Sequence, residues 1–259
     1  VRSSAASDVY KRQVSNHAES GESASSFLAK GRLDKVLSMS RPGDWMIVEF
    51  GHNDQKHPHL QAYNGYPENL RRFIAEIRAK KALPILATPI ARNTWTEQNG
   101  KLTYNDLLHD HAQACIALGK ELNVPVLDLH QAAMEDIIRL GRDASKIYYH
   151  QGDWTHTNDY GAVRAAGYAA DALRSLGGTF PEYLPLIQAV SASIKPWKPE
   201  AALLLEKPVR LAGVKGPNGT EEGTAAQDHQ AEKDGGDALA RLLAAVQSAR
   251  GPVSYTHLR

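Results

Sequence analysis

Three short apolar runs, at 45–50, 83–88 and 124–129, constrain the fold of this 259-residue chain more than any other feature. Stretches with apolar residues at helical spacing separate the runs. Strands that alternate with helices of ten or more residues form parallel βαβ units. Strands that are apolar on both sides need helices on both faces of their sheet. The sequence therefore predicts an α/β protein with a three-layer, doubly wound parallel sheet.

The same periodicities place the other elements. Pro67 suits the first turn of a helix, and Leu70, Phe73 and Ile77 then recur at helical spacing. Residues 14–18 are typical of the end of a further strand, and 89–103 are expected to form a loop. We predict helices at 25–29, 33–39, from 67 onward, and at 104–122, 131–140 and 158–176, the last capped by Thr157 or Asn158.

Charge and composition argue against several classes of protein. Lys and Arg number 30 against 29 Asp and Glu, and this net charge of +1 gives no reason to expect a nucleic-acid partner. No run approaches the roughly 18 apolar residues of a membrane-spanning helix, so we expect no membrane partner. Cys115 is the single cysteine, which excludes an internal disulfide. The oligomeric state does not follow from these features.

Changes in composition divide the chain into segments. Residues 1–13 and 253–259 have no periodicity, and we expect both to be non-native ends. The α/β domain is predicted at 14–190 and an irregular linker at 191–236. Apolar residues at helical spacing return at 237–252, which we interpret as the start of a second domain.

Polar residues follow the first apolar run directly. Gly51 allows the backbone to bend sharply as it leaves the sheet, and His52, Asn53 and Asp54 come next. Open α/β sheets bind their ligands at the carboxyl ends of their strands, so these side chains are candidates for a site. The alternative is that Asn53 and Asp54 only form a turn.

A second polar cluster carries the chemistry. Asp153 and His156 are three residues apart, so the carboxylate can accept the imidazole N–H and make the ring a general base. The amide of Asn53 and the backbone N–H of Gly21 could both point at a developing oxyanion. An acid, a base and two such donors fit acyl transfer better than metal or hydride chemistry. The alternatives are a surface Asp with a capping His, and ordinary turn residues at Asn53 and Gly21.

Three stretches in this order resemble a known family. Asn16-His17-Ala18-Glu19-Ser20-Gly21-Glu22-Ser23, Gly51-His52-Asn53-Asp54 and Asp153-Trp154-Thr155-His156 look like the second, third and fifth blocks of the SGNH (GDSL-type) hydrolases. They are most similar to the rhamnogalacturonan acetylesterase branch. The resemblance covers about 14–178 and implies a flavodoxin-like SGNH fold. It also implies Gly21 and Asn53 as oxyanion donors, His156 as general base and Asp153 as its orienting acid.

One family feature does not occur in the sequence. The nucleophile of the family is the Ser of a Gly-Asp-Ser block that closes the first strand, and the chain contains no Gly-Asp-Ser. We expect this block roughly 30 residues before Gly21, so that the first strand is absent from this chain. Ser23 is not its substitute, because it is placed to cap the following helix. We therefore expect this chain to fold poorly and to have no esterase activity.

Other side chains near these blocks have weaker roles. Trp154, Trp95 and Tyr63 could stack on sugar rings or simply pack their loops. His57 and His59, with His52, could suggest a metal, but a His-rich loop without ligand spacing is more often solvated. We predict no cofactor and no metal for the reaction, and His52 is expected to orient loops rather than to react.

The sequence thus predicts a serine esterase that removes acetyl groups from a rhamnogalacturonan- or pectin-like carbohydrate. The expected partner is an acetylated polysaccharide or oligosaccharide. A polymer substrate implies a secreted or periplasmic protein, although no signal peptide is visible. Two alternatives stay open: a non-catalytic carbohydrate-binding or defunct form of the same fold, and an SGNH lipase or thioesterase.

Overall fold

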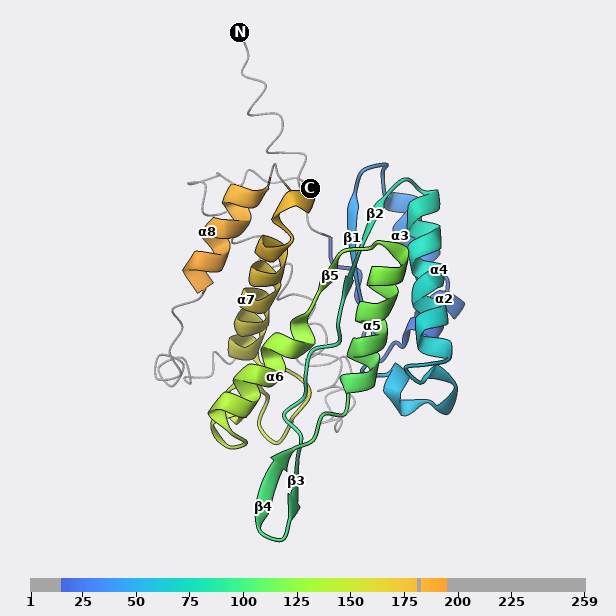
Figure 1. Ribbon diagram of the computed structural model, residues 1–259. Helices are drawn as coiled ribbons and strands as arrows, with labels where there is room; N and C mark the ends of the chain where they lie inside the picture. Colours follow the sequence, from blue (N-terminus) through green and yellow to red (C-terminus); the bar gives the residue numbers. More distant parts are fainter. Residues whose placement is uncertain (1–14, 181–182, 195–259) are drawn as a thin grey trace, which may run out of the picture.

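The computed structural model describes residues 15–180 and 183–194, and within them a parallel sheet lies between two layers of helices (Figure 1). The sheet contains β1 (Trp45–Glu49), β2 (Leu83–Ala87) and β5 (Val126–Leu127). The helices of one layer are α2 (Ala24–Ala29), α3 (Arg32–Met39), α4 (Gly65–Ala79) and α5 (His109–Leu122). Those of the other layer are α6 (Leu129–Leu140), α7 (Asp159–Ser175) and α8 (Leu184–Ile194). Short 3-10 helices lie at Asp54–Lys56 (η1), Pro58–Leu60 (η2), Ala144–Tyr148 (η3) and Gly177–Thr179 (η4).

The strand order confirms the predicted parallel, doubly wound sheet. β2 lies in the middle of the order β1-β2-β5, with Ile47 beside Ile85 and Leu86 beside Val126. Every connection between these strands passes through a helix, as parallel pairing requires.

Alternate residues of the strands enter two separate cores. Ile85 and Leu127 pack toward α6 and α7, whereas Val48 and Leu86 pack toward α2–α5. All four side chains are buried or nearly so. Successive side chains of a strand point to opposite faces of the sheet. Because apolar residues occupy both faces of these strands, each face needs its own layer of helices. The carboxyl ends of the strands are thereby left as the polar edge of the sheet.

Helix boundaries follow local capping chemistry. Asn158 caps α7 by accepting a hydrogen bond from the Gly161 N–H at 2.9 Å, and Asp128 caps α6. The predicted cap of α7 at Asn158 is thus confirmed. None of the described helices is long and apolar enough to cross a bilayer.

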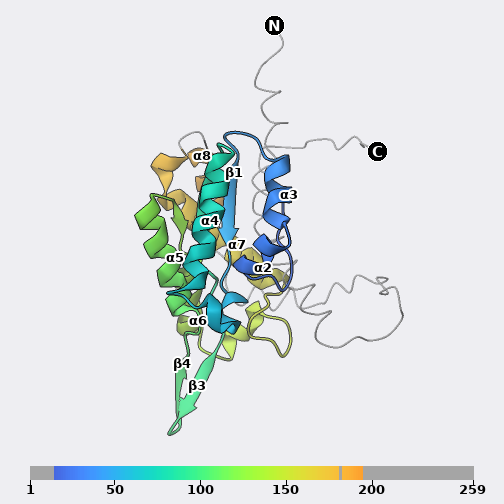
Figure 2. The same cartoon turned by 90° about the vertical axis from the view of Figure 1, so that its right-hand side faces the viewer.

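A two-stranded hairpin replaces most of the loop predicted at 89–103. β3 (Trp95–Gln98) pairs antiparallel with β4 (Lys101–Tyr104), and Asn99-Gly100 form the connecting turn. The hairpin extends from the body of the molecule at the end where the strands finish (Figures 1 and 2). Its last residue, Tyr104, was the expected first residue of the helix predicted at 104–122, which begins at His109 instead. The prediction failed because exposed strands show no apolar alternation.

Two strand predictions need correction and several segments lie outside the described residues. Residues 15–19 are irregular rather than strand, because a strand needs a hydrogen-bonded neighbour and the described residues supply none for them. β5 is two residues long, shorter than the run at 124–129. The predictions for 1–13, 237–252 and 253–259 fall outside the described residues, as does most of the linker predicted at 191–236, whose first four residues belong to α8 and are helical instead. α8 was not predicted.

Candidate active site

Gly51 turns the chain sharply at the end of β1. Its φ is +141°, and a Cβ at this position would lie 2.8 Å from both Cβ and Cγ of Pro89. Only glycine combines this backbone conformation with so close a neighbour. The turn directs His52, Asn53 and Asp54 across the carboxyl edge of the sheet, as predicted.

Asp54 joins two segments of the predicted site. Its side chain is fully buried, and its two carboxylate oxygens accept hydrogen bonds from the N–H groups of Ala24 (3.0 Å) and Gly51 (3.1 Å). Burial raises the pKa of Asp54 to about 6, although these N–H groups oppose the rise. The carboxylate thus fixes the start of α2 against the turn after β1.

The predicted oxyanion donors lie on these two joined segments. Gly21 has a φ of +72° and open space around its α-carbon. The next residue, Glu22, is buried, and its carbonyl oxygen accepts a hydrogen bond from the Asn53 amide at 3.2 Å. Its carboxylate binds Lys30 (2.6 Å) and Arg32 (3.1 Å). The structure therefore brings Gly21 and Asn53 to one place, which sequence spacing alone could not show.

Asp153 and His156 form the pair expected from their spacing. Oδ2 of Asp153 lies 2.6 Å from Nδ1 of His156, while Oδ1 accepts hydrogen bonds from the N–H groups of Thr155 (2.6 Å) and His156 (3.1 Å). The side chains are 29% and 19% exposed. Burial alone would raise the pKa of Asp153, but the hydrogen bonds from His156 and Thr155 lower it below its usual value. An ionised carboxylate on Nδ1 orients the ring so that Nε2 is the nitrogen that can accept a proton.

The loop that carries this pair is held by backbone contacts. The His150 N–H donates to the His156 carbonyl at 3.2 Å, and the Asp153 N–H donates to the His150 carbonyl at 3.0 Å. The Asn93 N–H donates to the Trp154 carbonyl at 2.8 Å, which ties the loop to the segment after β2. These backbone hydrogen bonds therefore fix the conformation of the loop.

Arg92 connects the two predicted blocks and was not predicted as a site residue. Its guanidinium donates to the His52 carbonyl (2.9 Å) and to Gln55 Oε1 (3.0 Å), and its charge acts on Asp153. Desolvation and the Arg92 charge lower the pKa of His52 to about 3, so this ring is neutral at pH 7. His52 Nε2 lies 2.9 Å from the Ile90 carbonyl, a contact that fits the predicted loop-orienting role. The feature of the sequence that could have indicated Arg92 is its place in the loop after the strand predicted at 83–88.

The three predicted sugar-binding aromatics lie in different settings. Trp154 is 56% exposed and lies beside Asp153 in the sequence. Trp95 donates to Asn93 Oδ1 at 2.6 Å and packs edge-on against Tyr104 at the base of the hairpin. Tyr63 is 73% exposed and donates to Asp110 at the start of α5. Two of the three are thus connected to the Asp153–His156 loop, and Tyr63 contacts a different element.

Ser23 has the capping role predicted for it. Its hydroxyl oxygen accepts a hydrogen bond from the Ser26 N–H at 3.1 Å, and its own N–H donates to Ser26 Oγ at 2.9 Å. This reciprocal pair is a capping box at the start of α2. His57 and His59 stack loosely on each other at the surface, with ring centroids 5.6 Å apart.

A buried carboxylate connects η3 and α7, the two elements on either side of the Asp153–His156 loop. Asp136 on α6 accepts hydrogen bonds from Tyr148 (3.0 Å), Tyr168 (2.7 Å) and Arg164 (2.7 Å), and also binds Arg139. Burial raises its pKa, but Arg164 and the other donors outweigh burial and lower it well below the usual range. The network fixes α6, η3 and α7 to one another.

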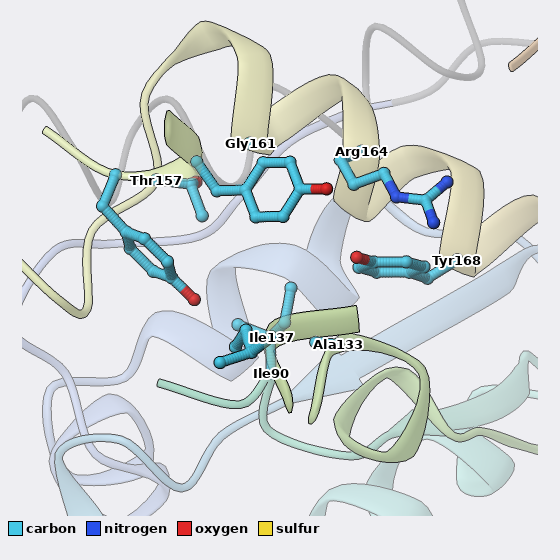
Figure 3. A pocket seen from close by; sticks show the side chains of 9 residues that line it. Ile90, Ala133, Ile137, Thr157, Gly161, Arg164 and Tyr168 are labelled. Carbon is cyan, nitrogen blue, oxygen red and sulfur yellow. The ribbon is translucent and has the colours of Figure 1, made fainter. Parts of the chain in front are cut away.

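A small hollow beside this network is visible in Figure 3. Its lining includes Ile90 after β2, Ile137 on α6, Tyr148 in η3, and Arg164 and Tyr168 on α7. Asp153, His156 and Asn53 do not line the hollow. We therefore interpret the hollow as a packing gap between α6 and α7 and not as the substrate site.

Comparison with known proteins agrees with this geometry. An Asp–His pair near amide groups at the carboxyl edge of an α/β sheet is an arrangement that acyl transfer can use. Residues 3–164 match the GDSL-like Lipase/Acylhydrolase family, and the chain belongs to that family. The predicted SGNH fold and family are thereby confirmed, and the chain is a hydrolase of the esterase type.

Two curated relatives from Bacillus subtilis (strain 168) are similar over most of their length. Rhamnogalacturonan acetylesterase RhgT is 32% identical over 184 residues, which cover 66% of this chain and 78% of RhgT. The probable rhamnogalacturonan acetylesterase YesY is 32% identical over 189 residues, covering 69% and 81%. The crystal structure of YxiM from Bacillus subtilis superposes with a TM-score of 0.56 at 29% identity, covering 64% of this chain and 46% of that one. The chain thus spans about half the length of YxiM.

Proposed function

We propose that this protein is a serine esterase that removes acetyl groups from a rhamnogalacturonan- or pectin-like carbohydrate. The observation that carries the proposal is the 2.6 Å contact between Asp153 Oδ2 and His156 Nδ1 at the carboxyl edge of the sheet. A fixed imidazole of this kind is what a hydroxyl nucleophile needs as its base. RhgT and YesY, which are named for rhamnogalacturonan, support the substrate class.

In the proposed mechanism, a serine hydroxyl attacks the acetyl carbonyl while His156 takes its proton. Asp153 stabilises the imidazolium that forms. The backbone N–H of Gly21 and the amide of Asn53 bind the oxyanion, and each donor contributes on the order of 100- to 1000-fold in rate. As the bond from the carbonyl carbon to the sugar oxygen breaks, His156 gives its proton to that oxygen and the acetyl group stays on the serine. Water, deprotonated by His156, then attacks the acetyl-serine, which releases acetate and restores the serine hydroxyl. Trp154 offers an exposed ring on which a sugar can stack.

The serine is proposed to come from a Gly-Asp-Ser block outside the printed sequence, which contains none. The chain as printed should therefore not turn over 4-nitrophenyl acetate. Turnover by this chain that disappears in His156→Ala would contradict this part of the proposal.

The test uses the protein expressed from its complete gene. We expect it to release acetate from acetylated rhamnogalacturonan, and we expect His156→Ala to lower kcat by about 10,000-fold. His59→Ala, which alters an exposed histidine away from the pair, is the matched control and should leave kcat unchanged. A loss under tenfold in His156→Ala would remove His156 from the mechanism. A series of acyl lengths separates an acetylesterase from a lipase or thioesterase, because only the latter would prefer long chains.

A further inference from the structure

We propose that Asp106, His109 and His130 form a binding site for a divalent transition-metal ion, with Zn²⁺ the best fit. One ligand atom from each residue lies within 4.8 Å of the others. The three residues come from separate elements: Asp106 follows β4, His109 begins α5 and His130 lies in the first turn of α6. None of them takes part in the proposed esterase mechanism.

The distances suit a small metal ion. His130 Nε2 lies 3.0 Å from Asp106 Oδ2, and His109 Nδ1 lies 3.5 Å from the same oxygen. Tetrahedral zinc with bonds of about 2.0–2.1 Å places its ligand atoms about 3.3 Å apart. The two distances to Asp106 are each within a few tenths of an ångström of this value, and the two histidine nitrogens lie within 4.8 Å of each other.

Both ring nitrogens of His130 face hydrogen-bond acceptors, an arrangement that is compatible with a bound metal ion. Its Nδ1 lies 3.2 Å from the Pro89 carbonyl oxygen, and its Nε2 faces the Asp106 carboxylate. Both neighbours accept hydrogen bonds, but a neutral imidazole has only one N–H to donate. Donation from Nδ1 to Pro89 leaves the Nε2 lone pair facing a carboxylate, an arrangement that a bound cation stabilises. A proton between His130 Nε2 and Asp106 Oδ2 would join only these two atoms. A metal ion would also account for His109 Nδ1, which lies 3.5 Å from the same oxygen.

The surroundings hold two of the ligands in place. His130 is only 2% exposed, and the contact with Pro89 fixes the orientation of its ring, as outer contacts do in metal sites. Asp106 Oδ1 accepts a hydrogen bond from the Leu108 N–H at 3.3 Å, which directs Oδ2 toward the histidines. His109 is 58% exposed, so solvent can reach the ion and supply its fourth ligand. Two imidazoles and one carboxylate favour Zn²⁺ or Co²⁺ over Mg²⁺ or Ca²⁺, which prefer oxygen.

A metal at this position would brace the base of the hairpin. Asp106 lies two residues after β4, and His130 belongs to the helix that follows β5. Tyr104, the last residue of β4, donates its hydroxyl to the Arg92 carbonyl at 3.0 Å. The ion would therefore cross-link the hairpin and the sheet edge from which Arg92 reaches the candidate active site.

The test measures metal binding directly and does not depend on esterase activity. The protein is stripped with a chelator and titrated with Zn²⁺ by calorimetry, and Co²⁺ is used for its visible absorption spectrum. We expect one Zn²⁺ per chain, a Co²⁺ spectrum of the four-coordinate type, and a rise in Tm on binding. Ca²⁺ should produce none of these effects.

Variants identify the ligands. His109→Ala and Asp106→Asn should each weaken Zn²⁺ binding at least tenfold while leaving the metal-free Tm close to that of the parent, because neither side chain is buried. The matched control is His59→Ala, another exposed histidine, which should bind Zn²⁺ as the parent does. If the parent binds no Zn²⁺ at micromolar concentrations, or if the variant that combines His109→Ala with Asp106→Asn binds as tightly as the parent, the contact between His130 and Asp106 is an ordinary ion pair and the proposal is wrong.

Discussion

Replacing Gly51 by alanine tests whether the turn after β1 depends on glycine. The new Cβ would lie 2.8 Å from Cβ and Cγ of Pro89, closer than carbon atoms approach without displacement. Both contacted atoms belong to a stiff pyrrolidine ring, so the ring cannot rotate aside. The backbone would also have to keep a φ of +141° that alanine disfavours.

The two effects can be added approximately. Holding a non-glycine residue in such a conformation costs about 1–3 kcal/mol, and overpacking costs about 1–3 kcal/mol. We therefore expect Gly51→Ala to lower the free energy of unfolding by roughly 2–6 kcal/mol. Urea unfolding followed by tryptophan fluorescence measures this change as a shift in midpoint, which at about 2 kcal/mol per molar urea is roughly 1–3 M.

The matched control is Gly100→Ala in the hairpin turn. Gly100 also has a positive φ, +72°, but a Cβ there would meet nothing within 4 Å. Only the positive φ disfavours alanine at this position, so we expect the free energy of unfolding to fall by about 1–2 kcal/mol. If the two variants are equally destabilised, the contact with Pro89 contributes nothing and the reasoning is wrong.

Two further variants should show opposite dependence on pH. Asp54 has a folded pKa of about 6, above the ordinary value, so the folded state binds the proton first and wild type gains stability as the pH falls. The free energy of unfolding of wild type relative to Asp54→Asn should therefore rise by up to about 3 kcal/mol between pH 7 and pH 4. Asp136 has a lowered pKa, so its contribution is present above about pH 4 and is lost on further acidification. Asp136→Asn should cost about 3 kcal/mol at pH 7, and this difference should shrink below pH 4. Urea unfolding at each pH measures both trends, and parallel curves for wild type and variant would contradict either assignment.

The sequence predicted those parts of the fold that depend on apolar periodicity. β1, β2, α4 and α7 were found close to their expected positions, because each buries a regular stripe or a continuous run. The hairpin at 95–104 escaped prediction because its side chains face solvent on both sides. The expected strand at 14–18 was wrong for residues 15–18, since periodicity cannot reveal whether a ladder partner is present.

The candidate site was predictable only where its contacts are local. Asp153 and His156 are three residues apart, so their contact followed from spacing. Asp54 was predicted only as a candidate without a role, and Arg92 was not predicted, because their contacts with Ala24 and with His52 span about 30 and 40 residues. Gly21 and Asn53 were proposed as a pair from their chemistry and from the family resemblance, and the structure supplied the contact between their segments through Glu22.

The turn at Asn99-Gly100 gives this protein a convenient place for engineering. Both residues have positive φ, and they join two strands whose side chains contribute little to either core. Chain tips of this kind accept inserted sequence with little loss of stability. A fluorophore or an affinity peptide placed there would stand clear of the sheet. Because Tyr104 and Arg92 connect the base of the hairpin to His52, such a label could also report on movements of the turn that carries Asn53.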